Sequence, residues 1–446
     1  MKVESQPTPA SRNVTPDVRS STAIEEFIRS ENAGAVLLFV ATVVALAWAN
    51  SSQSASYFAF WRRDLGVTLG GISFAMDLRH WIDDGLMSVF FLVVGLEIKR
   101  EIVKGELSSW NQAALPAIAA IGGMLVPAVI YFALNRYGEA VRGWAIPMAT
   151  DIGFALGALA LLGRRIPSTL RVFLLALAII DDLGAILVIA IFYTQHISPW
   201  AIGIALVLFA VLAAISSRVR EPVIYVLLSL AFWAAVLKSG VHPTIAGVLL
   251  GLLVPVKPRC EISGVIPYAR RLLEKLLLAL QSGEREIAAV TLSELQTVMH
   301  ATESPAERLE RRLHPWVSFV ILPVFALVNA GIMITADEFR SAIVSPAALG
   351  IFLGLTVGKL AGVAGSSFLA VRLGLAPMPD GTHGHHLVGV GMITGIGFTI
   401  ALFVSGLAFE TEILQSAAKM AILAASLVSG LLGYTYLRLV PRRIGA

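Results

Sequence analysis

Residues 172–190 read VFLLALAIIDDLGAILVIA, an apolar run long enough to cross a lipid bilayer with two adjacent aspartates at its centre. The whole chain has the composition that such a run suggests: 57% of its 446 residues are hydrophobic, 14% are charged and the mean hydropathy is +0.78. A water-soluble protein carries about 25% charged residues. The chain is therefore predicted to be an all-α polytopic membrane protein, which excludes an ordinary cytosolic enzyme.

About twelve apolar runs are candidate membrane spans. They lie near 34–50, 81–98, 112–134, 143–162, 169–193, 200–216, 222–237, 241–255, 315–334, 346–371, 387–409 and 416–437. The resulting organisation is a disordered tail at 1–33, spans 1–8 within 34–256, a linker at 257–313, spans 9–12 within 314–440 and a short tail at 441–446. The tail at 1–33 lacks the compact basic region of a signal peptide.

Lysine and arginine predict the orientation. Twenty-five of the 34 basic residues fall on the side that both termini share, eight fall on the other side, and Lys359 lies inside a span. Positive charge collects on the cytoplasmic side, so both termini are predicted to be cytoplasmic. The scattered charge does not suggest nucleic acid as a partner. Leu353 stands where a P-loop ending at Lys359 needs glycine, so no ATP site is expected, and neither is a cofactor.

Two segments outside the spans have recognisable patterns. Residues 65–78 alternate as two strands around Gly70–Gly71, which predicts a β-hairpin on the outer face. It is either a plain surface hairpin or a dimer contact made by strand addition. In the linker, Tyr268–Leu280 and Glu284–Met299 have helical apolar spacing. We expect an amphipathic helix pair on the membrane surface, with a regulatory role as the alternative.

A short internal match indicates an inverted repeat. Thr150-Asp151-Ile152-Gly153-Phe154 in span 4 resembles Thr394-Gly395-Ile396-Gly397-Phe398 in span 11. The two spans differ in number by seven and so cross the membrane in opposite senses, which relates spans 3–5 to spans 10–12. Nearby proline and glycine predict that both helices are broken near the midplane. Asp151 and Lys359 are suitably placed to balance the exposed helix dipole ends.

Asp181 and Asp182 are the strongest candidate site, because ionisable groups at the bilayer centre are costly and usually functional. Their oxygens suit a small hard cation such as Na⁺ or Li⁺. Burial and mutual repulsion disfavour ionisation, so protons bind when the cation is absent and leave when it arrives. Lys359 lies in a stripe with glycine at every fourth position, which lets a neighbouring helix approach. We expect either an ion pair with Asp181 that the cation breaks or a dipole-balancing charge.

Other polar residues carry less weight. Asp83 and Asp84 open span 2 as ordinary helix N-terminal charges, and His242 is read as structural. The three histidines at 383, 385 and 386 resemble a metal cluster but lie in a loop with no second ligand set, which favours a surface role.

Several motifs occur in an order that resembles the NhaA-type bacterial Na⁺/H⁺ antiporters. They are Gly85–Glu101, Gly143–Pro147 with Ala149–Asp151, Ala178–Ala185, Leu237–His242, Leu313–Trp316, Gly358-Lys359 and Gly395–Thr399. The resemblance covers about residues 25–440 apart from the linker. It implies twelve spans, crossed broken helices 4 and 11, and a dimer through the hairpin. It also implies electrogenic, alkaline-activated exchange of Na⁺ or Li⁺ for protons across the bacterial inner membrane.

The resemblance also implies residue roles. Asp181 and Asp182 form the cation and proton site, with Asp182 the more direct ligand, and Thr150, Asp151 and Lys359 belong to the crossing. The residues that match the pH-response cluster are Glu97, Arg100, Glu310 and His314. Arg311 stands where the family's best-known member has histidine, and the linker is longer than in that member, so the pH profile is open.

Three alternatives compete with exchange. A sodium-coupled solute symporter would need a roomier, more polar cavity than the spans suggest. An intramembrane aspartyl protease needs two aspartates from different helices around one water, with Asp151 as the partner of the Asp181–Asp182 pair. A channel would pass ions without counterflow and needs no carboxylate pair that competes for protons.

Overall fold

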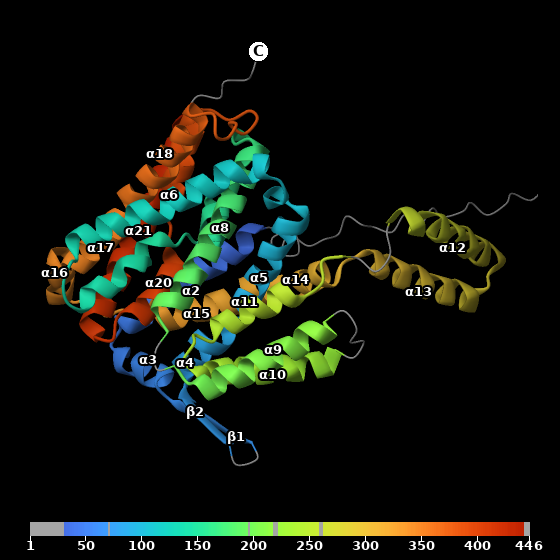
Figure 1. Ribbon diagram of the computed structural model, residues 1–446, viewed down its shortest axis with the longest axis horizontal. Coiled ribbons are helices and arrows are strands. Elements are labelled where there is room, and N and C mark those ends of the chain that lie inside the picture. Colours follow the sequence, from blue (N-terminus) through green and yellow to red (C-terminus); the bar gives the residue numbers. More distant parts are fainter. Residues whose placement is uncertain (1–30, 70–71, 195–196, 217–221, 258–261, 441–446) are drawn as a thin grey trace, which may run out of the picture.

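The computed structural model describes residues 31–69, 72–194, 197–216, 222–257 and 262–440. These residues form a helical bundle from which a two-stranded hairpin and a pair of helices project (Figure 1). The predictions for most of the N-terminal tail, for residues 441–446 and for the Gly70–Gly71 turn lie outside the described residues.

Helices account for almost all of the bundle. In its first half they are α2 (Glu31–Ala49), α3 (Ser54–Trp61), α4 (Leu78–His80), η1 (Trp81–Leu86), α5 (Met87–Lys104), η2 (Glu106–Ser108), α6 (Trp110–Leu134), η3 (Glu139–Met148), α7 (Ile152–Leu161), η4 (Gly163–Arg165), α8 (Ser168–Phe192), α9 (Pro199–Ile215), α10 (Pro222–Ser239) and α11 (Thr244–Leu253). In its second half they are α14 (Pro305–Trp316), η5 (Val317–Ile321), α15 (Leu322–Asn329), α16 (Ala336–Val344), α17 (Pro346–Leu353), η6 (Gly354–Gly358), α18 (Lys359–Arg372), α19 (Gly384–Ile393), α20 (Phe398–Ala408) and α21 (Glu412–Leu439).

Six to eight membrane spans are supported by helix length and composition within the described residues. Six are α6, η3–α7, α8, α14–α15, α17–α18 and α21, and two more are the bent pairs α2–α3 and α19–α20. The other four predicted runs coincide with α5 and with the shorter helices α9, α10 and α11. The prediction of a helical membrane protein with several spans is confirmed. The count of twelve spans and the inverted repeat stay predictions.

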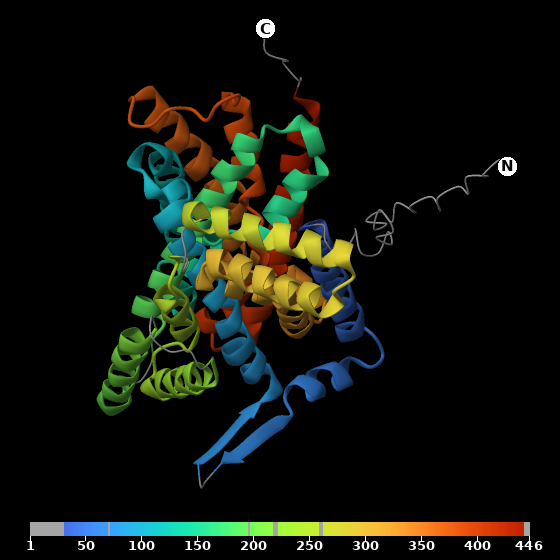
Figure 2. The same ribbon diagram turned by 90° about the vertical axis from the view of Figure 1, so that its right-hand side faces the viewer.

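The predicted hairpin forms. Strands β1 (Asp64–Leu69) and β2 (Ile72–Asp77) pair antiparallel, from Asp64 opposite Asp77 to Leu69 opposite Ile72. Figure 2 shows the hairpin extending away from the bundle. Its outer strand edges carry no partner strand among the described residues.

The linker contains two long helices, as its apolar spacing predicts. Helices α12 (Ile262–Ser282) and α13 (Arg285–Thr302) pack on each other and project from the bundle in Figure 1. Leu272, Ala279 and Ala288 are buried between them, while Leu277 and Leu278 are exposed. Their position on a membrane surface is untested.

Helices α6 and α18 pack closely because glycine faces glycine. A Cβ at Gly362 would lie 2.2 Å from the carbonyl oxygen of Gly122, and one at Gly358 would lie 2.9 Å from Cα of Pro127. The predicted glycine stripe thus admits a neighbouring helix, and this contact fixes α18 at the point where it carries Lys359.

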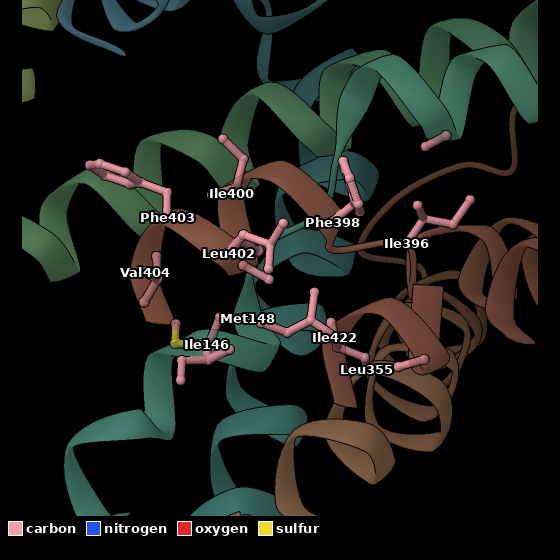
Figure 3. Packing of buried hydrophobic residues seen from close by; sticks show 14 of the residues in the cluster. Ile146, Met148, Leu355, Ile396, Phe398, Ile400, Leu402, Phe403, Val404 and Ile422 are labelled. Atoms are coloured by element: carbon pink, nitrogen blue, oxygen red, sulfur yellow. The ribbon is translucent and has the colours of Figure 1, made fainter. Parts of the chain in front are cut away.

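Two helices are interrupted, and the interruptions lie against each other. In the candidate span Glu139–Leu161, η3 gives way to Ala149–Asp151 before α7. Helices α19 and α20 are bent by 48° around residues 394–397. The backbone N–H of Asp151 donates to the carbonyl of Ile396 at 2.7 Å. Figure 3 shows Met148 of η3 among the buried side chains of α20, including Leu402. The crossing is therefore embedded in the largest apolar core.

Candidate ion site at the crossed helices

Asp151 caps the N-termini of both half-helices at the crossing. Its Oδ1 accepts the backbone N–H of Phe154 at 3.0 Å, in the first turn of α7. Its Oδ2 accepts the backbone N–H of Thr399 at 3.0 Å, in the first turn of α20, and also the Thr399 hydroxyl. First-turn N–H groups have no partner within their own helix and form the positive end of its dipole. The predicted balancing role of Asp151 therefore has a direct geometric basis.

The carbonyl ends at the crossing are satisfied by Thr150 and by the backbone. The Thr150 hydroxyl donates to the carbonyl of Thr394 at 2.9 Å, just after α19 ends. The Asp151 N–H bonds the neighbouring carbonyl of Ile396. Backbone groups freed by the two interruptions thus find partners in each other, which is what a break at membrane depth requires.

Lys359 is completely buried, and its Nζ lies 2.6 Å from Oδ2 of Asp181. Both side chains are 0% exposed. A buried charge is costly unless it is paired, and this pair satisfies each partner with the other. Of the two readings of Lys359, the structure favours the ion pair over a charge that acts directly on the carbonyl ends. Thr150 lies close to the same Asp181 carboxylate and connects the pair to the crossing.

Asp182 is buried beside this pair, but its carboxylate is not satisfied. Both of its oxygens, and Oδ1 of Asp181, are buried and have no hydrogen-bond partner among the residues that the structure describes. A buried polar atom without a partner costs about 1–3 kcal/mol, and more when it is charged. The cost falls when a proton or a cation binds there. Three carboxylate oxygens on adjacent residues are therefore available for a small hard cation.

A second group of charges joins α5 to α14. Arg100 of α5 forms a close ion pair with Glu310 of α14 and lies 3.2 Å from Oε1 of Glu101. Glu97, one turn earlier on α5, lies within electrostatic range of both Arg100 and Glu310. Near the end of the same interface, Lys104 contacts Glu307 at 3.0 Å. The structure thus brings together three of the four residues that match the pH-response cluster.

His314 lies one turn beyond Glu310 on α14, where its Nε2 is 3.5 Å from the Ser318 hydroxyl. It therefore belongs to the same helix face. Arg311 does not join the cluster, because its guanidinium pairs with Glu303 at 2.8 Å.

A third polar network lies at the start of α5. Asn329, at the end of α15, donates to Oδ1 of Asp83 at 2.6 Å, and Arg79 contacts Asn329 at 3.2 Å. Next to it, Nε2 of His242 is 3.6 Å from Oδ1 of Asp84. Asp83 and Asp84 thus contact side chains of other segments, beyond the helix N-terminal charges that the sequence suggests, and the structural role of His242 stays a prediction.

Sequence reasoning missed Thr399, Asn329 and Glu101 as contributors to these groups. Thr399 follows the repeated Gly-Ile-Gly-Phe motif, so its place after the second interruption could have indicated a partner for Asp151. Glu101 adjoins Arg100, but only the fold shows that it is buried, with Oε2 accepting the N–H of Glu106 at 3.1 Å. Nothing in the sequence links Asn329 with Asp83, which is 246 positions away.

Comparison with known proteins agrees with this architecture. Residues 25–437 match the family model described as Na⁺/H⁺ antiporter 1. The Na(+)/H(+) antiporter NhaA 2 of Sorangium cellulosum is 48% identical over 94% of this chain and 90% of its own length. The Na(+)/H(+) antiporter NhaA of Oleidesulfovibrio alaskensis is 48% identical over 93% of each chain, and that of Rhodospirillum rubrum is 46% identical over 94% of this chain and 98% of its own. The chain therefore belongs to the Na⁺/H⁺ antiporter 1 family of membrane transporters.

Proposed function

We propose that the protein exchanges Na⁺ or Li⁺ for protons, exporting Na⁺, with Asp181 and Asp182 as the shared binding site. The observation that carries this proposal is the buried Asp182 carboxylate, whose two oxygens lack partners within the described part of the chain. Relatives that are 48% identical over almost the whole chain are named Na⁺/H⁺ antiporters, which supports the same activity here.

The exchange step is a competition for oxygen atoms. Without a cation, a proton neutralises Asp182, which burial and repulsion by Asp181 destabilise as an anion, while Asp181 is paired with Lys359. An arriving Na⁺ or Li⁺ binds Asp182 and displaces its proton. The cation also draws Asp181 away from Lys359, and the unpaired, buried ammonium of Lys359 releases the second proton. Release of two protons for one cation moves net charge, so the membrane potential drives the cycle at about 2.3 kcal/mol per 100 mV. The exchange is therefore electrogenic in this proposal.

The crossed half-helices can move around the site. Asp151 and Thr150 hold the two interruptions together through side-chain hydrogen bonds, and Thr150 also lies near Asp181. A change at Asp181 can thus reach both half-helices without breaking the rest of the bundle. This supports alternating access around a fixed site, as in transporters with broken helices.

The α5–α14 cluster is proposed as the pH-responsive element. Glu97, Arg100, Glu310 and His314 lie on two helices, one of which is followed directly by the rest of span 9. Protonation of a carboxylate here weakens the Arg100–Glu310 contact and shifts α14 relative to α5. The contact of Arg311 with Glu303 keeps that arginine apart from this response.

The wider architecture completes the proposal. Twelve spans contain an inverted repeat of spans 3–5 and 10–12, with both termini cytoplasmic in a bacterial inner membrane. The open edges of the 64–77 hairpin support a homodimer formed by strand addition. Crosslinking across the hairpin, compared with a variant lacking residues 65–76, tests the dimer: loss of the dimer on deletion is expected, and an intact dimer refutes this interface.

A proteoliposome assay tests the exchange. Vesicles enclosing a pH dye receive Na⁺, Li⁺ or K⁺, and proton movement is recorded for the wild type, for Asp182→Asn and for the exposed control Asp380→Asn. Na⁺ and Li⁺ should drive proton movement in the wild type and in the control but not in Asp182→Asn. An active Asp182→Asn variant, or a wild type in which neither Na⁺ nor Li⁺ moves protons, refutes the mechanism.

The alternatives have less support. Solute symport is not favoured, because the relatives are named antiporters. Peptide hydrolysis would need Asp151 as a free partner of the aspartate pair, yet both its oxygens accept hydrogen bonds from the half-helices. A channel is distinguished by the same vesicle assay, because it would move cations without moving protons.

A further inference from the structure

A hollow on the surface of the bundle lies between α6 and the 3₁₀ segment η3. Its volume is about 590 Å³. Leu125, Val129 and Phe132 of α6 and Trp144 of η3 form its apolar lining, and Arg136 and Tyr137 lie where α6 ends. Leu125, Val129 and Phe132 are each more than half exposed, so this surface faces the surroundings of the bundle.

The hollow results from how η3 packs. A 3₁₀ helix is narrower than an α-helix, so η3 fills less space beside α6 than a regular span would. On its inner side η3 lies flush against the bundle: a Cβ on Gly143 would meet the Tyr131 hydroxyl at 2.4 Å and the Phe409 ring at 2.5 Å. Trp144 is held edge-on to Phe192 with ring centres 5.1 Å apart. The space beside Trp144 is therefore fixed by packing.

Arg136, the basic side chain at this end of the hollow, is available to bind an anion. Within the described residues Arg136 forms no ion pair, whereas Arg142, in the first half of η3, pairs with Glu410 at 3.0 Å. The neighbouring Glu139 accepts the backbone N–H groups of Glu410 and Thr411 at 2.8 and 3.2 Å. Arg136 thus lies just beyond the apolar helix α6, where the phosphate groups of a bilayer meet the end of a span.

We propose that the hollow binds one anionic phospholipid, with an acyl chain against Leu125, Val129 and Trp144 and the headgroup phosphate on Arg136. The hollow is open and lined mostly by apolar side chains, so in a bilayer an acyl chain can lie in it. Arginine binds phosphate through two parallel hydrogen bonds. Its positive charge favours phosphatidylglycerol over phosphatidylcholine, because the choline of phosphatidylcholine cancels the charge of the phosphate. The bound lipid would contact both η3 and α6 and so stabilise the packing of η3, the first half of the interrupted span, against α6.

Brominated lipids test this proposal through tryptophan fluorescence. The protein is placed in nanodiscs of non-brominated phosphatidylcholine, and phosphatidylglycerol or phosphatidylcholine with brominated chains is titrated in. The chain has eight tryptophans, so the Trp144 signal is obtained as the difference between wild type and Trp144→Phe. Half-maximal quenching of Trp144 should need about fivefold less phosphatidylglycerol than phosphatidylcholine, as one basic residue at a membrane surface provides.

Matched arginine variants locate the headgroup. Arg136→Gln should abolish the preference for phosphatidylglycerol, and Arg142→Gln should keep it because that arginine already has a partner. Quenching of the other seven tryptophans, and an unchanged circular dichroism spectrum, verify that each variant is folded. Equal quenching by the two lipids in the wild type indicates ordinary boundary lipid and overturns the proposal. No quenching of Trp144 by either lipid also overturns it, because a second protein copy then covers the hollow.

Discussion

Replacing Thr399 by valine tests whether Asp151 holds the two half-helices together. Asp151 accepts three hydrogen bonds at the crossing: from the Phe154 N–H, the Thr399 N–H and the Thr399 hydroxyl. Thr399→Val removes the hydroxyl and keeps the shape of the side chain. The carboxylate then faces a methyl group in a site where Asp151 and Thr399 are each only 2% exposed.

The expected loss follows from the kind of hydrogen bond removed. A hydrogen bond to a charged group contributes about 1.5–3 kcal/mol. The free energy of unfolding should fall by about that amount, which is roughly a 10- to 150-fold change in the ratio of folded to unfolded protein. The loss in free energy of unfolding should lie in the upper half of this range. The methyl group of valine takes the place of the hydroxyl but cannot solvate the Asp151 carboxylate.

Thr42→Val is the matched control. Thr42 is also buried, but its hydroxyl donates to the carbonyl of Leu38 within its own helix, at 2.8 Å. A neutral bond of this kind contributes about 0.5–1.5 kcal/mol. Both variants are compared by equilibrium unfolding in detergent micelles, followed by circular dichroism. Equal losses for Thr399→Val and Thr42→Val would refute the reasoning that Asp151 is an ionised cap at the crossing.

Two further predictions concern packing and charge. Gly362→Ala should destabilise the protein by about 1–3 kcal/mol or more, because the new Cβ meets the backbone of α6. Gly365→Ala on the same helix has open space and should be neutral or stabilising. Thermal unfolding compares the two variants, and similar melting temperatures contradict the close α6–α18 contact. A double-mutant cycle with Arg100→Gln and Glu310→Gln should give a coupling energy above the roughly 0.2–1 kcal/mol typical of exposed pairs, since both side chains are mostly buried. Additive effects would show that the α5–α14 cluster does not act as a unit.

Much of the fold could be predicted from local sequence. Apolar runs such as 172–190 predict helices from length alone, and alternating residues around two glycines predict the hairpin. The glycine stripe on both sides of Lys359 predicts a close helix contact, which the structure confirms with α6. These features depend on residues that are near one another in the chain.

The path of the chain through the bilayer could not be established in the same way. The run at 34–50 forms one helix, α2, but the sequence does not show that α3 follows it at an angle of 116°. Helices α9, α10 and α11 are apolar but short, so their composition does not decide whether they cross a membrane. The length of an apolar run limits whether a helix can span the bilayer, but it does not determine how the helix is oriented.

The residues of the candidate site could be named from the sequence, but their contacts could not. Asp181, Asp182, Asp151 and Lys359 stand out because charge is rare inside spans. Their pairing depends on the fold: Lys359 is 178 positions from Asp181, and Thr399 is 248 positions from Asp151. The sequence leaves two roles open for Lys359, and its contact with Asp181 favours the ion pair.

The central claim is that protons and Na⁺ compete for the buried oxygens of Asp182, and the pH dependence of the apparent KM for Na⁺ tests it most directly. KM is measured in proteoliposomes at a series of pH values on the Na⁺-binding side. Because a carboxylate ligand must be deprotonated to bind the cation, each fall of one pH unit should raise KM about tenfold per competing proton, with the maximal rate little changed. A KM that stays constant while the rate falls with pH would contradict the account, because protons would then act away from the Na⁺ site.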